Sequence, residues 1–460
     1  MNFDILEIIN NRLGENYDLH DRYLNRSLVK VLKTIGFDKV YSRAQGAYLY
    51  DREGRDFLDC LGGYGAVNIG RNHPVVKQTL RNLLDRDMPN MVQMDCSLLS
   101  GALAEALVKR SPPHLNAVFL CNTGTEAVEG AIKFARCFTG RESLLYCHKA
   151  FHGLSTGALS MNGSHVFKNR FGSLLPSQAV DLDDVAALER ELATRKHAAF
   201  FIEPIQGKTV HHPRNANFWP RAQELCRKHG TLLVCDEVQT GLGRTGRFYS
   251  FEHWNLEPDI VTLAKSLSGG LVPCGAILLR REIHDRTFNS MHHCVVHSTT
   301  FGRNNMAMAA ALATLHVMDA EKVVENSEKM GASLMSGLKA LMPRHEFIKE
   351  IRGKGLMVAI EFAKPQSLKL RMAWKIFQAA EKGLFAQMVV IPLLRDHRIL
   401  TQVTGHQMDV IKITPPLIIG SKEIDRIVKA MDATLSECYK FPGEMWNMGA
   451  NLVKASLQNK

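Results

Sequence analysis

Short, almost wholly apolar runs alternate with amphipathic segments through the middle of the chain. The runs AVFL at 117–120, AAFFIEP at 198–204 and TLLVCDEV at 231–238 predict strands, and helices are predicted from Thr125 and around 221–229. Strands that are apolar on both faces are typical of a parallel sheet whose two sides are covered by helices. The pattern therefore predicts an α/β fold for this region.

Different patterns flank the predicted sheet. Residues 46–59 alternate as two short strands around a turn at 51–54, which predicts a hairpin. A long helix is predicted over 306–320 and leads into mixed helix and strand patterns. We therefore expect a large domain with a mostly parallel sheet over 75–320 and a smaller α+β C-terminal domain over 321–460. The N-terminal segment, 1–74, is expected to pack with the small domain.

Composition narrows the class of protein. The chain has 460 residues, 45% hydrophobic and 22% charged, as expected for a globular protein with a large core. The formal charge is +11, but no run of five or more basic residues occurs, so we expect no nucleic acid partner. The ten cysteines form no CxxC pair, which indicates reduced thiols and a cytoplasmic location. We expect neither a secretory signal nor a membrane span.

Polar residues follow the predicted strands in an order that suggests chemistry. The segment 122–126 (NTGTE) follows AVFLC and opens a helix, where free N–H groups favour a phosphate. A plain N-cap by Thr123 or Thr125 is the alternative interpretation. The hydroxyl-rich loop 297–302 (HSTTFG) precedes the long helix and offers either further phosphate contacts or ordinary turn chemistry.

Asp236 and Lys265 each follow an apolar strand. Ligands of open α/β sheets bind at the carboxyl ends of the strands, and a protonated pyridine nitrogen is a suitable partner for an acid there. An amine in a Gly-rich turn can lose its proton and attack an aldehyde. In isolation, Asp236 could equally be a capping or salt-bridged residue and Lys265 a surface lysine.

Together these segments carry a family resemblance over nearly the whole chain. The runs LLVCDEVQTGLGRTG and PDIVTLAKSLSGGLVPCGA, with NTGTEAVEGAIKFAR, AFHG, FIEPIQG and HSTTFG in order, resemble the subgroup III (class-III) aminotransferases. The resemblance implies the α/β fold type I of enzymes that use pyridoxal 5'-phosphate (PLP). It also implies a ping-pong transaminase in which Lys265 holds the cofactor as a Schiff base and moves the proton.

The resemblance assigns roles to further residues. Asp236 would pair with the pyridine nitrogen, and Glu203 would act indirectly, by contacting the residues that bind the cofactor. Thr300 would reach the phosphate from the neighbouring subunit of a homodimer. The remaining expected cofactor contacts are the phosphate-binding residues Gly124 and Thr125, the ring-stacking Phe151 with its neighbour His152, Val238 on the opposite ring face, and Gln239 at the ring hydroxyl.

Two departures from the family pattern bear on the substrate. Leu154 stands where the family commonly has the arginine of HGRT, and Lys412 replaces an arginine before the Pro415–Pro416 turn. An arginine fork matches a carboxylate, whereas a lysine offers only a point charge. With Tyr64 as a further pocket candidate, we expect a donor amine without a nearby carboxylate, either a diamine such as putrescine or an aliphatic amine.

The expected acceptor is a 2-oxo acid, either 2-oxoglutarate held by Lys412 or pyruvate. The segments HSTTFG and AAALATLHVM resemble putrescine aminotransferases, whereas GGYGAVNIG and KSLSGGLVP resemble ornithine aminotransferases. An ornithine- or 4-aminobutyrate-type activity is therefore the alternative within the family.

Three short motifs suggest other functions. The glycines of 241–246 satisfy GxGxxG, but this segment is not the first turn of a βαβ unit, as a dinucleotide site requires. Gly153–Gly157 satisfies the GxSxG of serine hydrolases, with Asp236 and His297 as conceivable partners of Ser155. The histidines at 292, 293 and 297 lack a second ligand pair, so no metal site is expected.

Overall fold

The computed structural model describes residues 3–457 apart from 381, 406–407 and 441. Its largest sheet has seven strands in the order β4-β10-β9-β8-β7-β5-β6. These strands are β4 (Ala117–Cys121), β5 (Ser143–Cys147), β6 (Ser177–Val180), β7 (His197–Ile202), β8 (Leu232–Asp236), β9 (Ile260–Leu263) and β10 (Gly275–Leu279). Only β10 runs antiparallel to its two neighbours, so the expected α/β fold with a mostly parallel sheet is confirmed.

Helices cover both faces of this sheet, as its apolar strands require. Every residue of β7 and β8 is buried. Successive side chains of a strand point to opposite faces. Phe201 accordingly packs in a cluster with the apolar face of α7 (Gly124–Thr139), while Phe200 packs in a cluster with residues of α11 (Phe218–His229). The remaining helices of this region are α5 (Pro74–Leu84), α6 (Leu98–Lys109), α8 (Thr156–Ser160), α9 (His165–Lys168), α10 (Val185–Ala193), α12 (Arg281–Thr287) and α13 (Asn305–Ala320).

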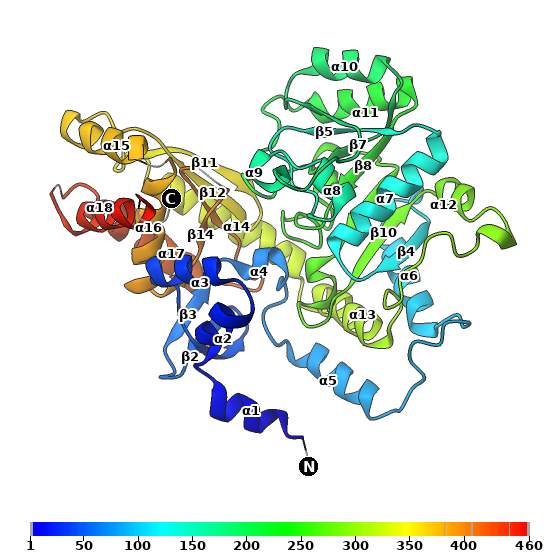
Figure 1. The fold of residues 1–460 in the computed structure, drawn as a ribbon, viewed down its shortest axis with the longest axis horizontal. Helices are drawn as coiled ribbons and strands as arrows, with labels where there is room; N and C mark the ends of the chain where they lie inside the picture. Colours follow the sequence, from blue (N-terminus) through cyan, green and yellow to red (C-terminus); the bar gives the residue numbers. More distant parts are fainter. Residues whose placement is uncertain (1–2, 381, 406–407, 441, 458–460) are drawn as a thin grey trace.

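The C-terminal part forms a second, smaller layer of helices on strands, on the left of Figure 1. Its sheet, in the order β11-β12-β15-β14, is antiparallel throughout. The strands are β11 (Ile348–Lys354), β12 (Met357–Phe362), β14 (Gln402–Val403) and β15 (Val410–Ile413). The helices are α14 (Val323–Lys339), α15 (Leu368–Ala380), α16 (Leu384–Arg395), α17 (Ser421–Glu437) and α18 (Glu444–Leu457).

The predicted hairpin at 46–59 is confirmed as the antiparallel pair β2 (Tyr48–Asp51) and β3 (Asp56–Asp59). β3 also pairs in parallel with β13 (Ile399–Leu400), which ties the N-terminal segment to the C-terminal part of the chain. β1 (Tyr41–Gln45) completes this sheet, and α1 (Ile5–Arg12), α2 (Asn16–Tyr23), α3 (Arg26–Thr34) and the short α4 (Gly62–Gly65) complete the segment. The domain limits at 74 and 320 stay a prediction.

Among the described helices, none has the length and apolar character that crossing a bilayer demands.

Candidate active site

Three neighbouring strands lead into polar residues at one edge of the large sheet. β7 leads into Glu203, β8 ends at Asp236, and Lys265 follows β9 after one residue. Because the three strands are adjacent and parallel, their carboxyl ends meet where ligands of open α/β sheets bind. All three residues line one cavity of about 670 Å³, a size typical of small-molecule sites.

Asp236 is held in place by hydrogen bonds on both oxygens. It is only 4% exposed, its Oδ2 lies 2.7 Å from His152 Nδ1, and its Oδ1 accepts the Val238 N–H at 3.0 Å. Burial lowers the pKa of His152, but the hydrogen bond to Asp236 and the charge of that carboxylate outweigh burial, so the pKa is raised. A carboxylate fixed in this way is suited to stabilise another positively charged group that enters the cavity.

Lys265 begins a short 3₁₀ turn, η2 (Lys265–Ser268), with a φ of 46°. Non-glycine residues rarely adopt this left-handed conformation, and such strain is concentrated at functional sites. Burial lowers the pKa of Lys265 more than the charges of Asp236 and Glu203 raise it. A lowered pKa increases the unprotonated fraction of the amine, which is the form that attacks an aldehyde.

Glu203 and Lys412 bind the two backbone polar groups of Gly207. Glu203 accepts the N–H of Phe151 at 2.9 Å and that of Gly207 at 2.6 Å. Lys412 is 3% exposed and donates from Nζ to the Gly207 carbonyl oxygen at 2.8 Å. Burial, with a contribution from the charge of Lys265, lowers the pKa of Lys412 to about 7. Glu203 therefore supports the cavity wall at Phe151, and Lys412 lines the cavity with its amine engaged.

The start of α7 supplies the expected phosphate end of the cavity through Gly124 and Thr125. Thr123 is the N-cap and forms a capping box with Glu126, so the simpler interpretation of this motif also holds. A Cβ at position 124 would lie 2.7 Å from Val238 Cγ1, so this close approach requires glycine. A helix start offers backbone N–H groups and a positive dipole end to a phosphate.

The other expected contacts divide into two groups. Phe151, His152, Val238, Gln239 and Tyr64 all line the cavity. Tyr64 is 52% exposed, and its carbonyl oxygen accepts a hydrogen bond from Gln239 Nε2 at 2.7 Å. Leu154 is 54% exposed and is not among the lining residues, so the expectation that it contacts the substrate is not met within one chain.

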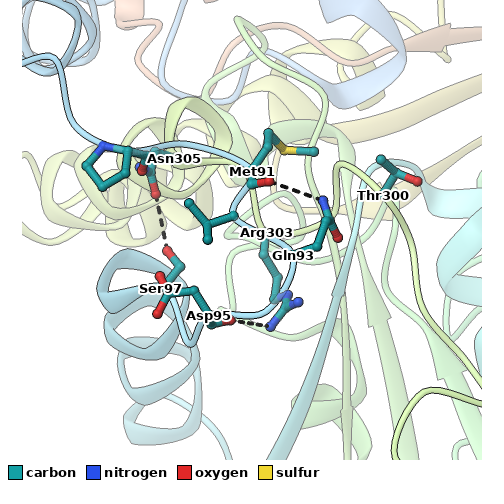
Figure 2. A pocket seen from close by; sticks show the side chains of 9 residues that line it. Met91, Gln93, Asp95, Ser97, Thr300, Arg303 and Asn305 are labelled. Carbon is teal, nitrogen blue, oxygen red and sulfur yellow. Dashed lines mark hydrogen bonds between the residues drawn. The ribbon is translucent and has the colours of Figure 1, made fainter.

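Thr300 lies apart from the cavity. It is exposed and lines a small depression of about 20 Å³ together with Gln93, Asp95 and Arg303, as Figure 2 shows. Arg303 Nη1 lies 3.5 Å from the Asp95 carbonyl oxygen there. One chain therefore does not bring Thr300 to its own cavity, and its expected role concerns the cavity of a second chain.

These residues fit PLP. Lys265 offers an amine to an aldehyde, Asp236 a buried carboxylate to a ring nitrogen, and Phe151 and Val238 apolar surfaces to a ring. The helix start at Gly124 offers N–H groups to a phosphate.

Several cavity residues were missed by sequence reasoning. Lys208 and Phe167 line one wall, and residues 402–405, including β14, reach the cavity from the small sheet. Lys208 directly follows FIEPIQG, so its place after a strand end was a usable signal. Nothing in the sequence indicates that residues 402–405 lie near Lys265, which is about 140 residues earlier in the chain.

The serine hydrolase interpretation is not supported by the contacts of Ser155. Its Oγ hydrogen-bonds to Thr125 Oγ1 and to Glu129 Oε1. Asp236 contacts His152, whereas His297 stacks on Phe119 with ring centroids 4.5 Å apart. The three residues required for a triad are therefore engaged elsewhere.

The GxGxxG segment, 241–246, packs against distant parts of the chain. Arg244 within it is fully buried and donates to the carbonyl oxygen of Leu356 and to Asn68 Oδ1, at 3.0 and 2.6 Å. Burial lowers the pKa of Arg244 to about 9. No helix follows the segment directly: the next element is the 3₁₀ turn η1 (Ser250–Trp254). The dinucleotide interpretation therefore lacks its structural context.

Among the described residues, one group has ligand atoms close enough for a metal ion: His211, Glu350 and Glu361. Arg352 Nη1 donates to both carboxylates, at 3.0 and 2.6 Å, so both are already paired with a cationic side chain. The histidines at 292, 293 and 297 do not form such a group within the part of the chain that the structure describes.

Comparison with known proteins agrees with this geometry. The family model for class-III aminotransferases matches residues 34–435. The chain is 34% identical over 459 residues to the aminotransferase PigE of Serratia sp. (strain ATCC 39006). That match covers 93% of this chain and 54% of PigE, so the chain spans about half the length of this curated relative.

Two solved structures are similar over most of the chain. The ornithine aminotransferase of Toxoplasma gondii is 30% identical with a TM-score of 0.81, covering 95% of this chain and 100% of the other. An amine transaminase from an uncultivated Pseudomonas species, solved in its PLP-bound form, is 30% identical with a TM-score of 0.76. That likeness covers 87% of this chain and 95% of the other.

Proposed function

The chain belongs to the class-III aminotransferases, enzymes with PLP as their cofactor, and from this premise we propose that it moves an amino group from an aliphatic amine to a 2-oxo acid. The observation that carries the proposal is the single cavity shared by Lys265, Asp236 and the start of α7. In the proposed ping-pong cycle, the donor amine would give up its amino group first and, with the oxygen of a water molecule, would leave as an aldehyde or ketone. The 2-oxo acid then takes the amino group.

When bound, PLP supplies an electron-withdrawing ring that stabilises negative charge on the substrate carbon. Lys265 would accept the proton from that carbon and return it to the carbon that PLP contributes as its aldehyde, since its lowered pKa leaves the amine available as a base. Asp236 keeps a proton on the ring nitrogen, and its bonds to His152 and Val238 hold the carboxylate in place throughout. Phe151, fixed through its N–H by Glu203, orients the ring.

The charges around the cavity favour a donor without a second charge. Among the described residues, three lysines line it: Lys208, Lys265 and Lys412. Its two acidic lining residues, Glu203 and Asp236, are already hydrogen-bonded to backbone N–H groups or to His152. Within the part of the chain that the structure describes, the distal ammonium of a diamine would meet three amines and no carboxylate that is free of hydrogen bonds. A monoamine therefore fits better than putrescine, and the similarity to an ornithine aminotransferase supports the alternative of an ω-amino acid donor.

The donor proposal is tested by comparing kcat/KM for hexylamine, putrescine, ornithine and 4-aminobutyrate, with pyruvate and 2-oxoglutarate as acceptors. We expect hexylamine to be the best donor, by about tenfold or more, because an unpaired buried charge costs well over 1 kcal/mol. A strong preference for ornithine or 4-aminobutyrate would establish the alternative instead. A preference for putrescine over hexylamine would contradict the argument that the cavity disfavours a second positive charge, but it would not contradict transamination.

We also propose that the chain acts as a homodimer in which Thr300 completes the neighbouring cavity. Three exposed apolar side chains lie near Thr300. Val92, which lines the same depression, is 52% exposed, and Val295 and Phe301, which are close in the sequence, are 71% and 60% exposed. A contiguous apolar patch marks an interaction surface, and these side chains are candidates for one. Light scattering after gel filtration should give twice the mass of one chain, and a fully active monomer would contradict the proposal. The cytoplasmic location stays a prediction.

A further inference from the structure

We propose that Lys208, rather than Lys412, binds the carboxylate of the 2-oxo acid acceptor. The inference rests on the proposed transamination, and it assigns a specificity-determining residue that the sequence motifs did not indicate. Any 2-oxo acid carries a carboxylate beside its reacting carbonyl carbon. A cavity that accepts such a compound needs a cation whose hydrogen-bond donors are free to reach that carboxylate.

Lys412 does not meet this requirement. Its Nζ donates to the Gly207 carbonyl oxygen at 2.8 Å, and the residue is 3% exposed. Its pKa is lowered to about 7, first by burial and then by the charge of Lys265, so near neutral pH much of the population is uncharged. Lys412 therefore has a structural role, because its hydrogen bond to Gly207 holds the loop that carries Lys208.

Lys208 has the free N–H donors that Lys412 lacks, although burial also lowers its pKa, against a smaller opposing effect from the charge of Glu203. Its Nζ lies 4.0 Å from the ring centroid of Phe167 and 4.6 Å from that of Phe151, so two aromatic faces stabilise the ammonium group. Among the residues that the structure describes, Lys208 forms no ion pair within 4.0 Å, and the carboxylate whose charge acts on it is that of Glu203. An ammonium group has three N–H donors, and within the described part of the chain the Lys208 Nζ makes no hydrogen bond to an oxygen or nitrogen atom. Lys208 is half-buried and lines the cavity.

The loop holds Lys208 in position. Gly207, the preceding residue, has its N–H bonded to Glu203 Oε2 and its carbonyl oxygen bonded to Lys412. A Cβ at position 207 would lie 2.1 Å from Gln239 Oε1, so glycine lets the loop lie close to the Gln239 side chain. The charges of both Lys208 and Lys265 act on Lys412, which places the three amines in one cavity.

The test separates the two half-reactions of the holoenzyme. The variants are Lys208→Met, Lys208→Arg and, as a matched control, Lys354→Met. Lys354 is also half-buried with its Nζ over an aromatic ring, 5.6 Å from the Trp254 centroid, but it does not line the cavity. Three quantities are measured: the KM for pyruvate and 2-oxoglutarate, the rate of the donor half-reaction without acceptor, and the Kd of the unreactive dicarboxylate glutarate by calorimetry.

In Lys208→Met we expect the acceptor KM and the glutarate Kd to rise about 10- to 100-fold, the range expected for a lost hydrogen bond to a charged group. The donor half-reaction should change far less. Lys208→Arg should recover most of the affinity, and Lys354→Met should behave as the wild type.

Unchanged acceptor KM and glutarate Kd in Lys208→Met would overturn the inference. So would an equal loss in both half-reactions accompanied by loss of bound cofactor, because Lys208 would then serve the cofactor. If the wild type transaminated no 2-oxo acid, the proposed function would fail. The glutarate Kd of wild type and Lys208→Met would still decide whether Lys208 binds carboxylates.

Discussion

Replacing Lys265 by alanine should abolish transamination and the visible absorption of the bound cofactor. The side chain is the amine placed beside Asp236 and Glu203, and its pKa is lowered by burial, as a nucleophile and proton carrier requires. Proton transfer by a positioned side chain contributes up to about 10⁴-fold in rate, so we expect kcat to fall by at least that factor. Steady-state kinetics and an absorbance scan of the purified variant measure both effects.

Lys265→Arg is the companion variant. Arginine keeps the positive charge but does not lose its proton in proteins, so it should be as inactive as alanine. An alanine variant with unchanged spectrum and activity would refute the role of Lys265. An active arginine variant would show that only the charge at this position matters.

Asp236→Asn should lower kcat by about 10²- to 10³-fold, the size of effect seen when one preorganised electrostatic group is removed from a reacting centre. An amide has nearly the same shape and keeps an oxygen for the Val238 N–H, but it lacks the charge that holds a proton on the ring nitrogen. The measurement is kcat together with the affinity for PLP, followed by the visible absorption.

Asp259→Asn is a matched control for Asp236→Asn. Asp259 is also a partly buried aspartate, but it precedes β9 and so lies at the opposite end of that strand from Lys265. It accepts the Leu233 N–H and pairs with Arg280, so its loss should lower the melting temperature and leave kcat nearly unchanged. Equal losses of kcat in the two variants would mean that the Asp236 effect is structural.

The sequence was most informative where one physical requirement fixes both pattern and place. A strand covered on both faces must be apolar throughout, so β7 and β8 could be recognised from their residues alone. Parallel strands end at one edge, so Glu203, Asp236 and Lys265 could be expected to lie together. The cavity brings these three residues together, in the predicted order along the chain.

Tertiary packing decided what the sequence did not predict. The pairing of β3 with β13 joins segments more than 300 residues apart, and the antiparallel direction of β10 follows from its connection rather than its composition. The partners of individual side chains were equally hidden. In one chain Lys412 donates to a carbonyl oxygen and Leu154 is exposed, and the sequence indicated neither contact; the expected substrate roles of both residues stay predictions.

The central claim is that Lys265, among the three lysines that line the cavity, is the one joined to PLP. Reducing the holoenzyme with borohydride would make that link permanent, and mass spectrometry of its peptides would locate it. We predict the added phosphopyridoxyl mass on the peptide that contains Lys265 alone. Finding it on Lys208 or Lys412 instead, or on no lysine of the cavity, would contradict the account.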